Sequence, residues 1–141
     1  MNKTGYTNVD SCDPRTCINS KIERSQRIIN SIFRKHVSQF GITSSQLSIL
    51  FILSKRGKCT GKELANILYL EKSSVSRNKR RMLQQELLES EGLHLLITSK
   101  GLELLEKVIP GWEKAMVETK EKLGSLGEES LNTLVNQLIT N

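Results

Sequence analysis

The stretch from residue 60 to residue 97 constrains the fold of this chain most strongly. Thr60 and Glu63 have the spacing of a capping box, in which each side chain accepts a backbone N–H of the other at a helix start. A short amphipathic segment and a tight turn follow, then a basic segment over residues 71 to 85 and two short extended runs around residues 91 and 92. A short helix, a tight turn, a second helix and a β-hairpin in this order predict a winged helix-turn-helix.

Long amphipathic helices are predicted on both sides of this segment. Asp13 followed by Pro14 is typical of a helix start, and apolar residues recur at three- and four-residue steps to about Ser38. Thr43 and Gln46 form a second capping box, ahead of a nearly apolar and therefore central helix.

The C-terminal third is predicted to be helical as well. Thr98 caps a helix that begins at Ser99, kinks at Pro110-Gly111 and ends near residue 123, and a final apolar helix follows. The 141 residues suit one domain, so the sequence predicts a mostly α fold with a small β-hairpin wing.

Positive charge is concentrated in the helix-turn-helix segment. The chain has a net charge of +6, and residues 55 to 81 hold nine basic residues against two acidic ones, a net +7. From residue 99 to the end, five Lys face seven Glu. This asymmetry favours a localised anionic partner. The chain has only three Phe, two Tyr and one Trp, which argues against an aromatic platform for single strands.

The helix expected over residues 71 to 85 has a face suited to DNA. At about 100° per residue, one arc of about 120° collects hydroxyl, amide and guanidinium groups, whereas Val75 and Met82 lie opposite. Serine hydroxyls bind phosphate, and Arg binds O6 and N7 of guanine together. The alternative is an ordinary solvated charged face, with or without its Arg residues paired to Glu elsewhere. The residues of this arc are Ser73, Ser74, Arg77, Arg80, Arg81 and Gln84.

Three segments resemble the MarR family of winged-helix transcriptional regulators. "EKSSVSR", residues 71 to 77, is similar to the family's "[DE]-K-[ST]-[ST]-V-[ST]-R" after a Leu-Ala pair and a short turn. "ITSKG", residues 97 to 101, resembles its "LT-x-x-G" between wing and helix, and "GITSSQLSIL", residues 41 to 50, resembles the segment before the motif. The resemblance covers about residues 15 to 140 in element order.

The resemblance implies a homodimeric, cytoplasmic regulator, a repressor, that binds a pseudo-palindromic double-stranded operator and responds to a small-molecule effector. Residues 14–38 and 99–140 would form the dimer base of the single domain 1–141, and residues 43–98 the DNA-binding lobe. By family position, Ser73, Ser74, Ser76 and Arg77 would meet bases and phosphates, with Arg80 and Arg81 as further candidates. Lys62 and Lys72 would hold the DNA backbone.

The chain departs from the family pattern at three places. Gly usually stands where Tyr69 stands, so the turn must be built differently, and Gly usually ends the recognition helix where Glu86 stands. The family wing usually carries an Arg for the minor groove, but here the hairpin is acidic, with Glu89 and Glu91 and only His94 as a possible cation. The acidic wing favours an alternative function, a winged-helix protein-interaction module without specific DNA binding.

A thiol-based redox sensor is a further alternative. Some relatives sense oxidants through a Cys near the start of the first helix with Tyr partners, and Cys17 lies roughly there. Cys12 is near enough for a local disulfide, and Arg15 would favour the thiolate. Neither Tyr of the chain falls in the first two helices, which favours inert thiols, and Cys59 is expected to be packed.

Other chemistry finds little support in the sequence. Trp112 either lines a ligand pocket between dimer base and lobe or belongs to the dimer core. His36 and His94 have no Cys or carboxylate at ligand spacing, so no metal site is predicted. With no P-loop, dinucleotide fingerprint or catalytic triad context, we expect no enzyme and no cofactor. With no signal peptide and no long apolar run, we expect no membrane association.

Overall fold

The structure is a computed structural model, and it describes residues 2–139. Its core is built around α3 (Ser44–Arg56). The Thr43 hydroxyl accepts from the backbone N–H of Gln46, and the Gln46 side chain accepts from that of Thr43, both at 3.2 Å. Leu50 and Leu53 are fully buried, and Gly57, with φ of 87°, ends the helix. The predicted capping box and the central place of this helix are confirmed.

Two further helices pack on α3 to form the helix-turn-helix. The capping box of α4 (Gly61–Leu68) is present as predicted, with the Thr60 hydroxyl 3.1 Å from the Glu63 backbone nitrogen. The second helix, α5 (Lys72–Gln84), buries Val75 and Met82. The half-buried Leu83 also packs against the core, whereas Ser73, Arg77, Arg80, Arg81 and Gln84 are exposed, as the helical periodicity predicts.

The turn between α4 and α5 corrects one prediction. Tyr69 itself adopts the left-handed conformation, with φ of 53° and ψ of 38°, and the Leu70 N–H donates to Ala65 O at 3.1 Å. This is the backbone that glycine favours after a helix, so the turn is not built differently. An L-residue in this region costs roughly 1–2 kcal/mol, which the surrounding packing must offset.

The wing is a three-stranded antiparallel sheet in the order β1-β3-β2. The predicted hairpin is confirmed as β2 (Leu88–Glu91) and β3 (His94–Ile97), with Gly92 at φ of 62° in its turn. The third strand, β1 (Lys58–Thr60), was not predicted. Cys59 pairs with Leu95 across β1 and β3, and both side chains are buried, as expected for Cys59.

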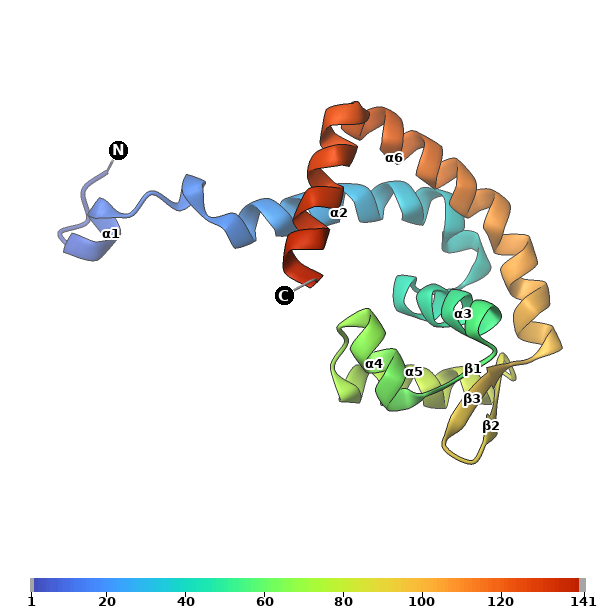
Figure 1. Cartoon of the computed structure of the whole chain (residues 1–141). Helices are drawn as coiled ribbons and strands as arrows, with labels where there is room; N and C mark the ends of the chain where they lie inside the picture. The colour runs from blue at the N-terminus through green and yellow to red at the C-terminus, as the bar shows by residue number, and fades with distance from the viewer. Residues whose placement is uncertain (1, 140–141) are drawn as a thin grey trace.

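A long, bent α6 (Ser99–Ile139) carries the chain away from the wing. The Thr98 hydroxyl accepts from the Gly101 N–H at 3.0 Å, which confirms the predicted cap. Pro110 lies inside the helix without interrupting it, whereas Gly124, with φ of 69° and ψ of 173°, breaks it. Beyond this break the last segment turns back and, in the view of Figure 1, passes in front of α2.

The N-terminal region differs from its prediction. Asp13 and Pro14 start only a 3₁₀ turn, η1 (Pro14–Thr16), and the long helix α2 (Ile18–Val37) begins four residues later than expected. A short helix, α1 (Thr7–Ser11), precedes it, and this arm extends away from the rest of the chain (Figure 1). The predicted start was wrong because Cys17, not Asp13, caps α2: its Sγ accepts from the Ser20 N–H at 3.4 Å.

Two glycines allow α6 to approach its neighbours closely. A Cβ on Gly111 would lie 2.5 Å from the carbonyl oxygen of His36, in the last turn of α2 and just before the 3₁₀ turn η2 (Ser38–Phe40). A Cβ on Gly101 would overlap the Leu87 carbonyl oxygen and the Ile97 side chain. The glycine of the "ITSKG" segment therefore has a steric reason, because α6 starts against the base of the wing.

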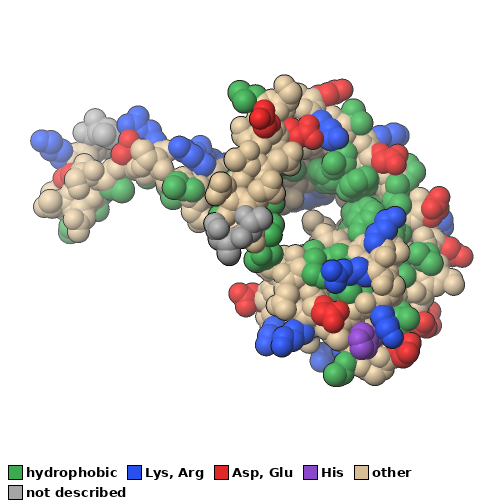
Figure 2. All heavy atoms as spheres, viewed as in Figure 1, with side chains coloured by type: hydrophobic (Ala, Val, Ile, Leu, Met, Phe, Trp, Pro, Cys, Tyr) green, Lys and Arg blue, Asp and Glu red, His purple; other side chains and the backbone are tan. Residues whose placement is uncertain are grey.

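Many apolar side chains on α2 and α6 are uncovered. In the view of Figure 2, hydrophobic side chains gather in the hollow between α6 and the helix-turn-helix. The exposed ones on the two helices are Ile18, Ile22, Ile28, Leu102, Val117, Leu126, Leu131, Leu134, Val135, Leu138 and Ile139. Within residues 2–139 no single helix has the length and apolarity to cross a membrane, although Ile18–Phe40 with Ser44–Arg56, bent by 74°, meets that test as a pair by length and composition only.

Candidate nucleic-acid interface

The solvent-facing side of α5 forms an open groove of about 350 Å³. It is lined by Ser76, Arg77, Arg80, Arg81 and Gln84. Ser73 is exposed and Ser74 is half-buried one turn earlier, where the Ser74 hydroxyl accepts from Arg77 Nη2 at 3.3 Å. The side chains that the helical wheel placed together therefore do share one face, and Ser76 extends it on one flank.

The guanidinium groups on this face have no acidic partner. Among residues 2–139, no carboxylate lies within 4.0 Å of the charged groups of Arg77, Arg80 or Arg81. In the described part of the chain these Arg residues are therefore not paired to Glu, while an ordinary solvated charged face stays the alternative. Apart from the hydrogen bond from Arg77 to Ser74, the N–H donors of these exposed guanidinium groups can bind phosphate or base oxygens.

Two exposed lysines lie at the starts of the helix-turn-helix helices. Lys62 is exposed in the first turn of α4, and Lys72 is exposed at the first residue of α5. Both lie where backbone N–H groups are also free, and such helix ends attract phosphate. This is the placement expected of residues that contact the DNA backbone.

The wing has no positive charge at its tip. Glu89 and Glu91 are exposed on β2, and Leu93 in the turn is 81% exposed. His94, which pairs with Glu91 across the hairpin, is half-buried. The tip would repel a phosphate backbone, as the sequence predicts.

A second concave surface lies between α2 and α3, near the turn that joins them. It has a volume of about 560 Å³, and its polar groups include Asn30 and Arg34. Trp112, the predicted pocket residue, is outside its lining and stacks at a tilt on Phe51, with ring centroids 5.3 Å apart. No sequence motif marks this cavity, because three segments meet to form it. Its lining is Ile29, Asn30, Phe33, Arg34, Val37, Ser38, Gly41, Ile42, Thr43, Ser44 and Leu47.

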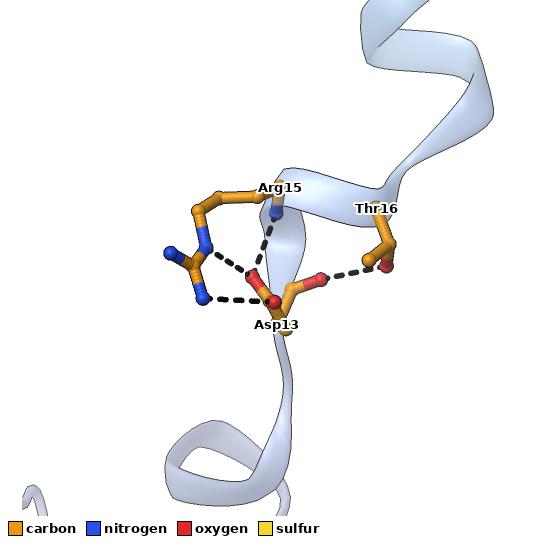
Figure 3. A network of polar contacts seen from close by, with 3 residues as sticks. All are labelled: Asp13, Arg15 and Thr16. Carbon is orange, nitrogen blue, oxygen red and sulfur yellow. Dashed lines mark hydrogen bonds and ion pairs between the residues drawn. The ribbon is translucent and has the colours of Figure 1, made fainter.

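The N-terminal cysteines lie in the exposed arm as free thiols. Arg15, expected beside Cys17, instead forms two hydrogen bonds with the Asp13 carboxylate, at 2.8 and 3.1 Å (Figure 3). This bidentate pair lowers the pKa of Asp13 and raises that of Arg15. Cys12 is exposed one residue beyond α1, and Cys17 serves as the cap of α2. Arg15, expected to stabilise a Cys17 thiolate, therefore pairs with Asp13 instead.

Glu118 joins α6 to the end of α2. Its carboxylate accepts from Lys35 and lies 3.6 Å from His36 Nε2. The hydrogen bond from Lys35, and secondarily the charges of Lys35 and His36, lower the pKa of Glu118. Within residues 2–139 no group of three His, Cys, Asp or Glu side chains is arranged to hold a metal ion.

Known proteins share both the motif and the fold. A model of the MarR family matches residues 40–93, which confirms the resemblance read from the motifs. A search of curated proteins found no match in sequence.

Solved structures match nearly the whole chain. MosR, a transcriptional regulator of M. tuberculosis, is 22% identical with a TM-score of 0.78, covering 92% of this chain and 100% of its own. BpsR of Bordetella bronchiseptica, whose DNA binding is regulated by 6-hydroxynicotinic acid, is 16% identical with a TM-score of 0.80, covering 90% and 96%. NadR in complex with 4-hydroxyphenylacetate is 22% identical with a TM-score of 0.76, covering 88% and 96%. At these identities the likeness concerns the fold, and the predicted winged helix-turn-helix is confirmed.

Proposed function

Because residues 40–93 match the MarR family and the whole chain has the fold of MarR-type regulators, we propose that this protein is a sequence-specific DNA-binding transcriptional regulator. It acts as a homodimer on a pseudo-palindromic operator, in the cytoplasm, and represses by occluding a promoter. The observation that carries the proposal is the exposed face of α5, whose Arg77, Arg80 and Arg81 have no acidic partner in the described residues.

Each part of this face has a distinct role in the proposal. Arg77 lies at the centre of the arc, one turn beyond Ser73, where a recognition helix is deepest in the major groove. It reads guanine with both arms of its guanidinium group. Ser73, Ser74 and Ser76 meet bases and phosphates, and Arg80 and Arg81 extend the contact. Lys62 and Lys72 hold the DNA backbone and set the register.

The homodimer is supported by the uncovered apolar side chains of α2 and α6. Ile18 is 75% exposed, Leu126 is 76% exposed and Leu138 is 65% exposed. Such a surface on helices at both chain ends is typical of an interface between copies. Residues 14–38 and 99–140 are accordingly the proposed dimer base, and residues 43–98 the DNA-binding lobe. Two copies related by a two-fold axis would present two α5 helices to two half-sites.

A small-molecule effector is proposed for the cavity between α2 and α3. The cavity adjoins both the dimer base and the central helix of the lobe, so a ligand there would couple the two. NadR has been solved with 4-hydroxyphenylacetate, and the DNA binding of BpsR is regulated by 6-hydroxynicotinic acid. By analogy the ligand is a small aromatic acid, for which Arg34 is the cation in the lining.

One observation favours a second function, a winged-helix module that binds a protein and no specific DNA. The wing tip carries Glu89 and Glu91 and exposes Leu93, a surface that suits a basic protein better than a phosphate backbone. A salt titration separates the two functions, because DNA binding weakens steeply and linearly in log salt as counterions are released.

Selection from a random pool of double-stranded DNA tests the proposal. The expected result is enrichment of one pseudo-palindrome whose half-sites lie about one helical turn, 10–10.5 bp, apart. Light scattering at low micromolar concentration should give about twice the chain mass of 15.9 kDa. A pool that stays random after repeated rounds contradicts specific DNA binding, and a clean monomer contradicts the dimer.

A further inference from the structure

Both ends of α5 carry a non-glycine residue in the left-handed conformation. Tyr69, before the helix, has φ of 53°, and Glu86, after it, has φ of 60°. They are the two such residues among residues 2–139. An L side chain is strained there, and a strained residue is retained where the surrounding structure or a function compensates for it.

The structure around Glu86 accounts for that residue without a function for its side chain. The Leu87 N–H donates to Met82 O at 3.0 Å, and the Thr98 hydroxyl donates to Glu86 O at 2.6 Å. The first bond closes the backbone around Glu86 and the second holds its carbonyl oxygen; neither involves its side chain, so glycine would serve equally well. The side chain is exposed, and its carboxylate lies 3.8 Å from Lys100 Nζ, a surface contact.

Tyr69 differs from Glu86, because its side chain is large and exposed and makes no hydrogen bond within residues 2–139. The side chain is 70% exposed, and its hydroxyl has no hydrogen-bond partner in residues 2–139. The backbone of the turn is closed by the N–H groups of Tyr69 and Leu70, which both donate to Ala65 O. Within residues 2–139, no hydrogen bond or ion pair of the Tyr69 side chain offsets the strain of an aromatic residue at a position where glycine would be unstrained.

The position of Tyr69 indicates what it contacts. It lies three residues before Lys72, at the N-terminal end of α5, where Ser73 and Ser74 begin the exposed face. Any duplex that accepts this end of the helix brings a phosphate backbone past the turn, and a tyrosine hydroxyl is a common donor to phosphate oxygens. We propose that Tyr69 is a DNA-backbone contact, donating its hydroxyl to a phosphate at the edge of each half-site; this rests on the proposed function.

A neutral contact of this kind has a signature that lysine and arginine lack. The hydrogen bond strengthens binding to any duplex equally, because phosphates carry no sequence information. It releases no counterion beyond those already displaced, so the slope of log affinity against log salt does not change when it is removed.

The test uses Tyr69→Phe, Tyr69→Gly and Glu86→Gly as full-length protein on the selected operator and on scrambled DNA. Tyr69→Phe should weaken binding by about 3- to 10-fold on both DNAs, with an unchanged salt slope. Tyr69→Gly should weaken it at least as much, while its melting temperature stays within a few degrees of the parent because relieved strain offsets the greater freedom of the unfolded chain. Glu86→Gly, the matched control at the other end of α5, should bind at least as tightly as the parent.

Two results overturn the inference while leaving the proposed function intact. One is binding by Tyr69→Phe and Tyr69→Gly within twofold of the parent on both DNAs. The other is a loss confined to the operator, which would make Tyr69 a base-reading residue. Should Tyr69→Gly prove unstable, Tyr69→Phe alone decides, because it keeps the ring and the backbone. A parent protein that selects no DNA overturns the proposed function itself, and Tyr69 then has no contact to make.

Discussion

Replacing Gly111 by alanine should destabilise the junction between α2 and α6, although alanine is the better helix former. Inside a helix, alanine is favoured over glycine by about 1 kcal/mol. The new Cβ, however, would lie 2.5 Å from the His36 carbonyl oxygen, 0.5 Å inside the 3.0 Å limit that Cβ atoms rarely cross. The obstacle is backbone and cannot rotate away, so the helices must separate. Overpacking of this kind typically costs about 1–3 kcal/mol.

A matched variant removes the helix-propensity term from this comparison. Gly127 also lies in α6, and a Cβ there would meet only side-chain atoms of Leu123, the nearest at 3.1 Å. Gly127→Ala should therefore leave the stability unchanged or raise it slightly. The difference in free energy of unfolding between Gly111→Ala and Gly127→Ala is expected to be about 1–3 kcal/mol, the steric contribution alone.

Denaturant unfolding followed by tryptophan fluorescence measures this difference. Trp112 is the single tryptophan, it is adjacent to Gly111, and it packs on Phe51 of α3. All variants must be compared at one protein concentration, because the stability of a dimer depends on it. If Gly111→Ala is as stable as Gly127→Ala, the close approach of α2 and α6 is not a constraint on residue 111, and the steric reasoning is refuted.

Three further outcomes are expected. The pKa of Glu118 is lowered in the folded state, so its contribution to stability is present above the ordinary pKa and is lost as the pH falls through the lowered value. On acidification, Glu118→Gln should therefore lose less free energy of unfolding than the parent. An equal loss for the two proteins contradicts this. Cys17→Ser should bind operator DNA like the parent under reducing conditions, because Ser also caps a helix. If peroxide changes the DNA binding of the parent but not that of Cys17→Ser, Cys17 is a redox sensor. Glu91→Lys should raise affinity for operator and scrambled DNA alike, and a gain limited to the operator would show that the wing reads sequence.

Local signals in the sequence predicted the elements that local chemistry builds. The capping boxes at Thr43 and Thr60 depend on residues three apart, and both are present. β1 was not predicted because a strand of three residues is too short to show a periodic pattern. Cys59 pairs with Leu95, far away in the sequence, and only the tertiary fold brings the two together. The start of α2 was misplaced because Asp13 before Pro14 also suits the 3₁₀ turn that forms there.

The sequence predicted which side chains share the exposed face of α5, but not that this face has no acidic partner in the described residues. The helical wheel gave the shared side of Arg77, Arg80 and Arg81, because one helix fixes their relative directions. That no carboxylate reaches them depends on how the other elements pack, which no local pattern records. The same holds for the cavity between α2 and α3, and for Tyr69, whose left-handed backbone goes against the ordinary preference of its residue type.

The affinity of Arg77→Ala for the selected operator and for scrambled DNA, measured across a salt series, tests the central claim most directly. A bidentate Arg–guanine contact provides about 1–3 kcal/mol of discrimination, so operator binding should weaken by roughly 5- to 150-fold while scrambled DNA is much less affected. Lys62→Ala, the control, should weaken both DNAs alike and lower the salt slope by about 2 for a dimer. An equal loss for Arg77→Ala on both DNAs would make Arg77 a phosphate contact and contradict the claim that α5 reads the operator sequence through it.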